Sequence, residues 1–104
     1  MRLNVINLNF KTMAFTEVDL QYKYSWEHTK KDDPKLRGEP DSSLLNRSEG
    51  YEVLYMIQRL MAAWNLKNVA SGKKIEKMIR EACPSNLHSQ AHVKQWIDTN
   101  WDKY

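Results

Sequence analysis

The clearest hydrophobic pattern runs through residues 46–65, where apolar side chains recur at steps of three and four. They are Tyr51, Leu54, Ile57, Met61 and Trp64, with Val53 and Leu60 widening the stripe. This spacing predicts an amphipathic helix that packs on a core. Asn46 fits the N-cap position, and Glu49, three residues later, would complete a capping box. Asn65 is a suitable end for this helix.

Two shorter amphipathic patterns follow toward the C-terminus. Residues 71–83 predict a helix capped by Ser71, and residues 89–101 predict a helix capped by Ser89. The apolar faces consist of Ile75, Met78, Ile79 and Ala82 in the first, and of Val93, Trp96, Ile97 and Trp101 in the second. The second half of the chain is therefore predicted to be helical.

Residues 15–26 alternate instead with a period of two. One side carries Val18, Leu20, Tyr22, Tyr24 and Trp26, and the other side is polar. This alternation, rich in aromatic residues, predicts a β-strand. Residues 3–10 also alternate, with one slip of phase, so the two runs predict an antiparallel hairpin. Two alternatives stay open: Met13 as the native start, which would make the first run dispensable, and residues 66–69 as a third strand.

A two-stranded ribbon is marginally stable in water, so its apolar face needs a cover, and the helix over 46–65 is the natural one. The predicted fold is therefore α+β. It is a single small domain over residues 1–104, in which an N-terminal two-stranded antiparallel β-ribbon is followed by three α-helices. Residues 27–45 contain Pro34, Gly38 and Pro40 among charges of both signs, and we expect an exposed charged loop there.

The composition is that of an ordinary globular chain. Of its 104 residues, 41% are hydrophobic and 28% charged, and the 11% aromatic content argues against disorder. The single cysteine, Cys83, has no partner for an internal disulfide, which favours a reducing cytoplasm. The N-terminal residues do not form the continuous apolar run of a signal peptide, and no stretch has the length and apolarity of a membrane span. We therefore expect a cytoplasmic protein without a membrane partner.

Basic side chains gather between residues 67 and 80. They are Lys67, Lys73, Lys74, Lys77 and Arg80, and with Glu76 as the one acidic residue the local charge is +4. Such a patch could lie along phosphates, and the whole chain is mildly basic at +3. The plainer interpretation is the solvated face of an amphipathic helix.

The region around Pro84 invites comparison with a helix-turn-helix, in which the second helix reads bases. The polar side chains available for this on the last helix are Gln90, His92, Lys94, Gln95, Asp98 and Asn100. Asp98 would repel phosphate, and the positive charge lies on the preceding helix instead. Two packed helices are therefore the plainer interpretation here as well.

Cys83, His88 and His92 fall within ten residues and are types that bind zinc. A structural zinc site uses four ligands, so His28 or Asp98 would have to complete it. The same three residues are the candidates for Cys–His catalysis, but the sequence near Cys83 lacks a glycine-rich turn that could form an oxyanion hole. We predict no metal, no cofactor and no enzymatic activity.

Most aromatic residues fall on predicted apolar faces, but Trp101 and Tyr104 lie close to the end of the sequence, where we expect partial exposure. Exposed aromatic side chains are typical anchors of protein–protein contacts. The leading hypothesis is a non-catalytic protein-interaction module, an adaptor or an inhibitor, whose partner is another protein. The alternative is a nucleic-acid-binding accessory protein that uses the basic helix 73–80. The oligomeric state is left open.

Overall fold

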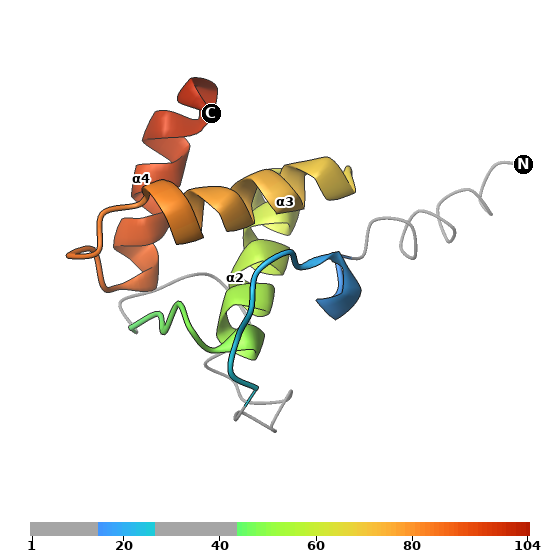
Figure 1. Ribbon diagram of the computed structural model, residues 1–104. Helices are drawn as coiled ribbons and strands as arrows, with labels where there is room; N and C mark the ends of the chain where they lie inside the picture. The colour runs from blue at the N-terminus through green and yellow to red at the C-terminus, as the bar shows by residue number, and fades with distance from the viewer. Residues whose placement is uncertain (1–14, 27–43) are drawn as a thin grey trace, which may run out of the picture.

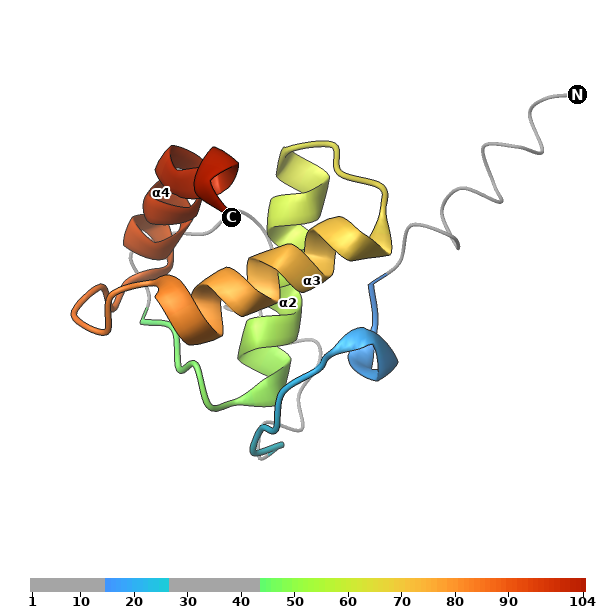
Figure 2. The ribbon, with the colours of Figure 1, turned by 45° about the horizontal axis from the view of Figure 1, so that its top comes forward.

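The computed structural model describes residues 15–26 and 44–104, and these residues form an all-helical arrangement (Figure 1). The three α-helices are α2 (Gly50–Ala63), α3 (Val69–Lys77) and α4 (Gln90–Asn100). A π-helical turn over Met78–Ala82 continues α3, and a 3-10 turn over Trp101–Lys103 continues α4. Both views show α3 running across α2, with α4 rising beside the far end of α3 (Figure 2).

The α+β prediction is wrong, because the described residues contain three helices and no sheet. Residues 15–26 were predicted as a strand, but they form an extended segment with one 3-10 turn at Glu17–Asp19. Its one β-type contact is an isolated bridge between Ser25 and Glu49. We call residues 15–26 the strap. Of the side predicted to be covered, Leu20, Tyr22 and Tyr24 are half-buried against helices rather than a second strand. Val18 is 89% exposed because the 3-10 turn interrupts the alternation, and Trp26 is 38% exposed.

The remaining strand and loop predictions are either outside the described residues or wrong. The predicted strand 3–10, the alternative start at Met13 and most of the predicted loop, residues 27–43, lie outside the described residues. The candidate third strand over 66–69 is wrong, because this segment is the connection between α2 and α3 together with the first residue of α3.

The start of α2 differs from the prediction by three residues. Its N-cap is Glu49 rather than Asn46, and the Glu49 carboxylate accepts a hydrogen bond from Glu52 N at 3.1 Å. Asn46 lies before the helix, where its side-chain oxygen accepts from Ser48 N. A carboxylate at an N-cap also suits the positive end of the helix dipole. Glu49 therefore takes the role that the sequence pattern gave to Asn46.

The end of α2 lies where the sequence predicted it. Asn65 adopts a left-handed conformation with φ of 55°, and Leu66 N donates to Met61 O at 2.8 Å while Asn65 N donates to Ala62 O. These two bonds are a Schellman motif, in which asparagine is one of the few residues other than glycine that tolerate the positive φ.

The predicted N-cap of α3 is wrong, and the predicted N-cap of α4 is confirmed. Asn68, not Ser71, caps α3, and its side-chain oxygen accepts a hydrogen bond from Ala70 N. Ser89 caps α4 as predicted, with Ser89 Oγ accepting from His92 N at 3.1 Å. Both Asn68 and Ser71 are good N-cap residues, so local propensity alone does not choose between them.

The core is formed where the three helices and the strap meet. Its buried side chains are Phe15, Leu45, Val53, Leu54, Met56, Ile57, Leu60, Met61, Ile75, Met78, Ile79, Cys83, Val93 and Ile97. Phe15, the first residue of the strap, is only 1% exposed, so the strap belongs to the packed interior at that end. In the part of the chain that the structure describes, no helix combines the length and apolarity needed to cross a membrane.

Candidate functional site

The five basic residues predicted to form a patch are divided among three environments. On one side of α3, Lys74 places its ammonium 4.0 Å from the centre of the Trp101 ring. On the strap side, Arg80 donates to Lys23 O at 3.1 Å and stacks over Tyr24, with its guanidinium carbon 4.7 Å from the ring centre. Cation–π contacts of this kind hold a cation on the protein surface. The remaining three, Lys67, Lys73 and Lys77, extend toward solvent to different degrees.

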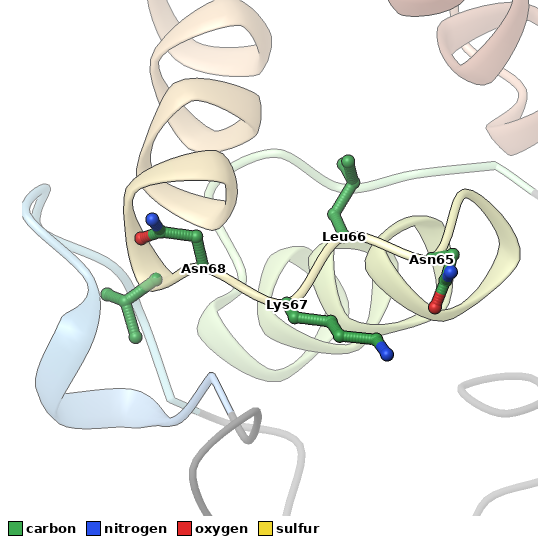
Figure 3. A pocket seen from close by; sticks show the side chains of 5 residues that line it. Asn65, Leu66, Lys67 and Asn68 are labelled. Atoms are coloured by element: carbon green, nitrogen blue, oxygen red, sulfur yellow. The ribbon is translucent and has the colours of Figure 1, made fainter. Parts of the chain in front are cut away.

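Lys67 lies in the connection between α2 and α3, beside a shallow open depression lined by Asn65, Leu66, Lys67, Asn68 and Val69. Figure 3 shows its side chain extending away from that of Leu66. Lys67 and Lys77 are exposed, and Lys73 is half-buried. The structure therefore does not bring the five cations together on one face, and the two on aromatic rings are already engaged within the molecule.

The helix-turn-helix comparison loses two of its base-reading candidates. Gln90 is only 3% exposed, and its side-chain oxygen accepts a hydrogen bond from Arg59 at 2.7 Å. Asn100 donates through its side chain to Trp96 O at 2.8 Å. Both amides thus make contacts inside the fold that would have to break before they could read a base edge.

Trp101 and Tyr104 have different environments. Trp101 is half-buried and meets Trp64 edge to face, with ring centres 6.1 Å apart, so it helps to close the core. Tyr104 is 56% exposed, and its ring is tilted beside that of Trp96, with ring centres 5.9 Å apart. Trp96 itself is half-buried against the core. We call Trp96, Trp101 and Tyr104 the C-terminal aromatic surface.

Cys83, His88 and His92 do not form a site. Cys83 is buried, and burial raises the pKa of its thiol against the opposing influence of the nearby Arg47. His88 and His92 are both exposed. Among the described residues, no group of three His, Cys, Asp or Glu side chains is placed to hold a metal ion. A thiol that resists ionisation is a poor nucleophile, so Cys83 has the character of a core residue.

Arg47 is a residue that the sequence reasoning missed. Its guanidinium donates to Cys83 O at 2.9 Å, Pro84 O at 2.8 Å and Leu87 O at 2.6 Å. These carbonyls follow the π-helical turn, where the helical hydrogen bonds run out, and a positive charge is favourable there. One side chain thus fixes the turn that carries the chain from α3 to α4.

Glu76 is the second missed residue. The sequence presented it as the one acid within a basic stretch, but its side chain is fully buried. The carboxylate accepts hydrogen bonds from Gln21 N at 2.9 Å, from Tyr22 N at 3.2 Å and from the Tyr24 hydroxyl at 2.7 Å. All three donors belong to the strap. The sequence signal that could have indicated this burial is the position of Glu76. It follows Ile75 directly and precedes Ile79 by three residues, next to the apolar face of α3.

The two strap tyrosines both donate to carboxylates of the α3 segment. The Tyr22 hydroxyl donates to Glu81, and this bond is the main reason that the pKa of Tyr22 is raised to about 12. Burial, followed by the hydrogen bond to Glu76, raises the pKa of Tyr24 well above its ordinary value. A hydroxyl that donates to an anion loses this hydrogen bond when it ionises, so the bond contributes to raising the pKa of both tyrosines.

The ends of the strap rest on two glycines. The Phe15 ring covers Gly72 of α3, where an added Cβ would overlap the ring and lie 2.9 Å from Met61 Sδ. The indole of Trp26 covers Gly50 of α2, where a Cβ would lie 2.5 Å from the ring atoms. Both glycines therefore leave room for an aromatic side chain of the strap. We call Gly50, Gly72 and Glu76, with the surface of α2 and α3 between them, the strap seat.

The chain matches no protein-family model, no curated protein and no solved structure. The functional argument therefore depends on the chemistry of these surfaces.

Proposed function

We propose that this protein is a small, non-catalytic, cytoplasmic protein-interaction module, an adaptor or an inhibitor, that binds its partner through the C-terminal aromatic surface. The observation that carries the proposal is the exposed Tyr104 ring tilted beside the half-buried Trp96. Tyrosine and tryptophan are enriched among the residues that dominate binding energy, because each buries a large area with few rotatable bonds. Support for a non-catalytic role comes from Cys83, whose thiol is buried and held protonated.

The charged side chains around this surface indicate what kind of partner surface would fit it. Lys74 lies on the Trp101 ring, and the exposed Lys103 precedes Tyr104. The exposed Asp102 lies in the same turn, so a partner would offer an apolar pocket for the tyrosine ring with an acidic group facing Lys103 and a basic group facing Asp102. Charged groups at the rim contribute mainly to the association rate and to specificity, while the buried aromatic ring contributes most of the affinity.

The test is affinity capture from host lysate with the tagged wild-type chain and with Tyr104→Ser, analysed by quantitative mass spectrometry. Loss of an aromatic hot spot costs about 2 kcal/mol or more, so recovery of a true partner should fall by roughly thirtyfold. Asp102→Ser is the matched control, because it changes an exposed neighbour and leaves the ring in place. A partner recovered equally by all three chains would show that Tyr104 is not the anchor.

The second candidate is a nucleic-acid-binding accessory protein that uses the basic residues of helix 73–80. The observation in its favour is the exposure of Lys67 and Lys77, with Lys73 half-exposed near them in sequence. Against it, Lys74 and Arg80 are engaged with aromatic rings. Charge reversal at Lys73 and Lys77 separates the two functions, because it should abolish nucleic-acid binding and leave the protein partner bound. Capture that collapses with nuclease or rising salt would favour this second function.

A further inference from the structure

We propose that the strap seat is a peptide-binding surface that the strap occupies as an internal ligand. Its external ligand would be an extended segment of a partner protein, with backbone N–H groups at its centre and an aromatic ring at each end. This surface is distinct from the C-terminal aromatic surface, and the inference does not depend on the function proposed above.

The first argument is the manner in which the strap is held. Between its two ends, the strap is bonded mainly to side chains of the helices, and at Ser25 its backbone also pairs with that of Ser48 and Gly50. Gln58 donates to Phe15 O, Glu76 accepts from the centre of the strap, and Arg80 donates to Lys23 O. Proteins that bind extended peptides also combine main-chain hydrogen bonds, which give affinity, with side-chain pockets, which give specificity. There the edge of a sheet supplies the hydrogen bonds, whereas here side chains of the helices supply them.

The second argument is the buried charge of Glu76. Its carboxylate is fully buried, and the hydrogen bonds that the structure gives it come from Gln21, Tyr22 and Tyr24 of the strap. A buried carboxylate without donors is strongly unfavourable. A ligand that displaces the strap must therefore bring N–H or O–H donors to the same place, which an extended polypeptide does.

The third argument is the pair of glycines. Gly72 and Gly50 receive Phe15 and Trp26, which are the first and last residues of the strap. Helix-interior glycine is destabilising relative to alanine, so Gly72 has a cost for α3 that the fitted Phe15 ring offsets. The two aromatic positions set the length of ligand that the seat accepts, twelve residues from ring to ring as in the strap itself.

The test measures binding of a labelled synthetic peptide, residues 15–26, to the full-length chain by fluorescence anisotropy. In the wild-type chain the internal strap competes, and the apparent affinity is reduced by the small fraction of chains in which the seat is empty. Phe15→Ala weakens the internal strap and leaves the seat intact. We expect the peptide to bind this variant at least tenfold, and on the order of a hundredfold, more tightly than it binds the wild-type chain.

The matched control is the double variant Phe15→Ala, Gly72→Ala. The new Cβ occupies the space that the peptide's own phenylalanine needs, and once Phe15 is removed it meets the flexible end of Met61, whose Sδ lies 2.9 Å away. Peptide affinity should therefore return to the wild-type level, while circular dichroism shows an unchanged helix content. A peptide carrying alanine in place of its phenylalanine should lose the gain in the same way.

Three results would overturn the proposal. The peptide could bind Phe15→Ala no more tightly than the wild-type chain. The gain in affinity could survive in the double variant, which would place the peptide elsewhere. Phe15→Ala could also lose its helical signal altogether, which would make the strap an obligatory part of the core rather than a ligand of it.

Discussion

Replacing Glu76 by glutamine is the most informative single perturbation of this fold. Glutamine keeps the shape of the side chain and one acceptor oxygen, but it places an NH₂ group where the second carboxylate oxygen was. In the structure, one carboxylate oxygen accepts from Gln21 N at 2.9 Å, and the other accepts from Tyr22 N, from the Tyr24 hydroxyl and, at 3.1 Å, from Gln21 N as well. If the NH₂ group replaces the first oxygen, Gln21 N faces a donor and keeps only its longer bond to the second oxygen. If it replaces the second oxygen, Tyr22 N faces a donor.

The expected cost follows from these contacts. Losing one hydrogen bond to a charged acceptor and leaving one partly buried donor unsatisfied destabilises by roughly 3 kcal/mol. Burying a neutral amide instead of a carboxylate recovers part of this, because the desolvation penalty is smaller. We therefore expect a net loss of about 2 kcal/mol in the free energy of unfolding, and a fall in Tm of about 10 °C for a chain of this size.

The assay is urea unfolding followed by far-ultraviolet circular dichroism, with the free energy of unfolding extrapolated to water. Glu81→Gln is the matched control, since Glu81 lies on the same helical segment, is exposed, and accepts only the Tyr22 hydroxyl among the bonds described above. It should change the free energy of unfolding by less than about 0.5 kcal/mol. If Glu76→Gln is as stable as the wild-type chain, the carboxylate does not hold the strap, and the account of the strap seat is wrong.

Three further predictions concern the same interior. Arg47→Ala should destabilise by about 2–3 kcal/mol in the urea assay, because the carbonyls after the π-helical turn lose their donor, and a loss below about 0.5 kcal/mol would refute this role. Stability should fall as the pH rises from about 10 toward 12, because unfolded tyrosine ionises near 10.0 while Tyr22 holds its proton to about 12. Tyr22→Phe should reduce that fall and leave the part that Tyr24 contributes, and an unchanged slope would contradict it. Cys83 is buried, so it should react with a thiol reagent at pH 8 only as fast as the fold opens. Arg47→Ala should raise the labelling rate at least tenfold. Fast labelling of the native chain would show that the thiol is accessible.

The helices of the second half of the chain could be predicted because their signals are local. The apolar stripe of α2, the Asn65 stop and the Ser89 cap all arise from residues within one or two turns of each other. Helix periodicity places several core residues on one face, so its signal accumulates over 14 residues in α2. Asn68 and Ser71 are both good caps, so local propensity does not choose between them, and Glu49 caps α2 although propensity favours Asn46. At both places the sequence prediction failed.

The strap shows what only the tertiary structure determined. Its alternation places Leu20, Tyr22 and Tyr24 on the half-buried side but fails at Val18, which is 89% exposed in the 3-10 turn. Alternation also carries no information about what lies against the covered side. The partners are Glu76, Gly72 and Gly50, which follow the strap by at least 24 residues along the chain. Contacts with distant segments also explain why the five basic residues between 67 and 80 have three different environments. Lys74 lies on the Trp101 ring, Arg80 bonds to the strap, and the other three extend toward solvent. Residue spacing fixes which side chains share a face of one helix, whereas their contacts depend on which distant segment packs against that face, and only the folded chain determines that.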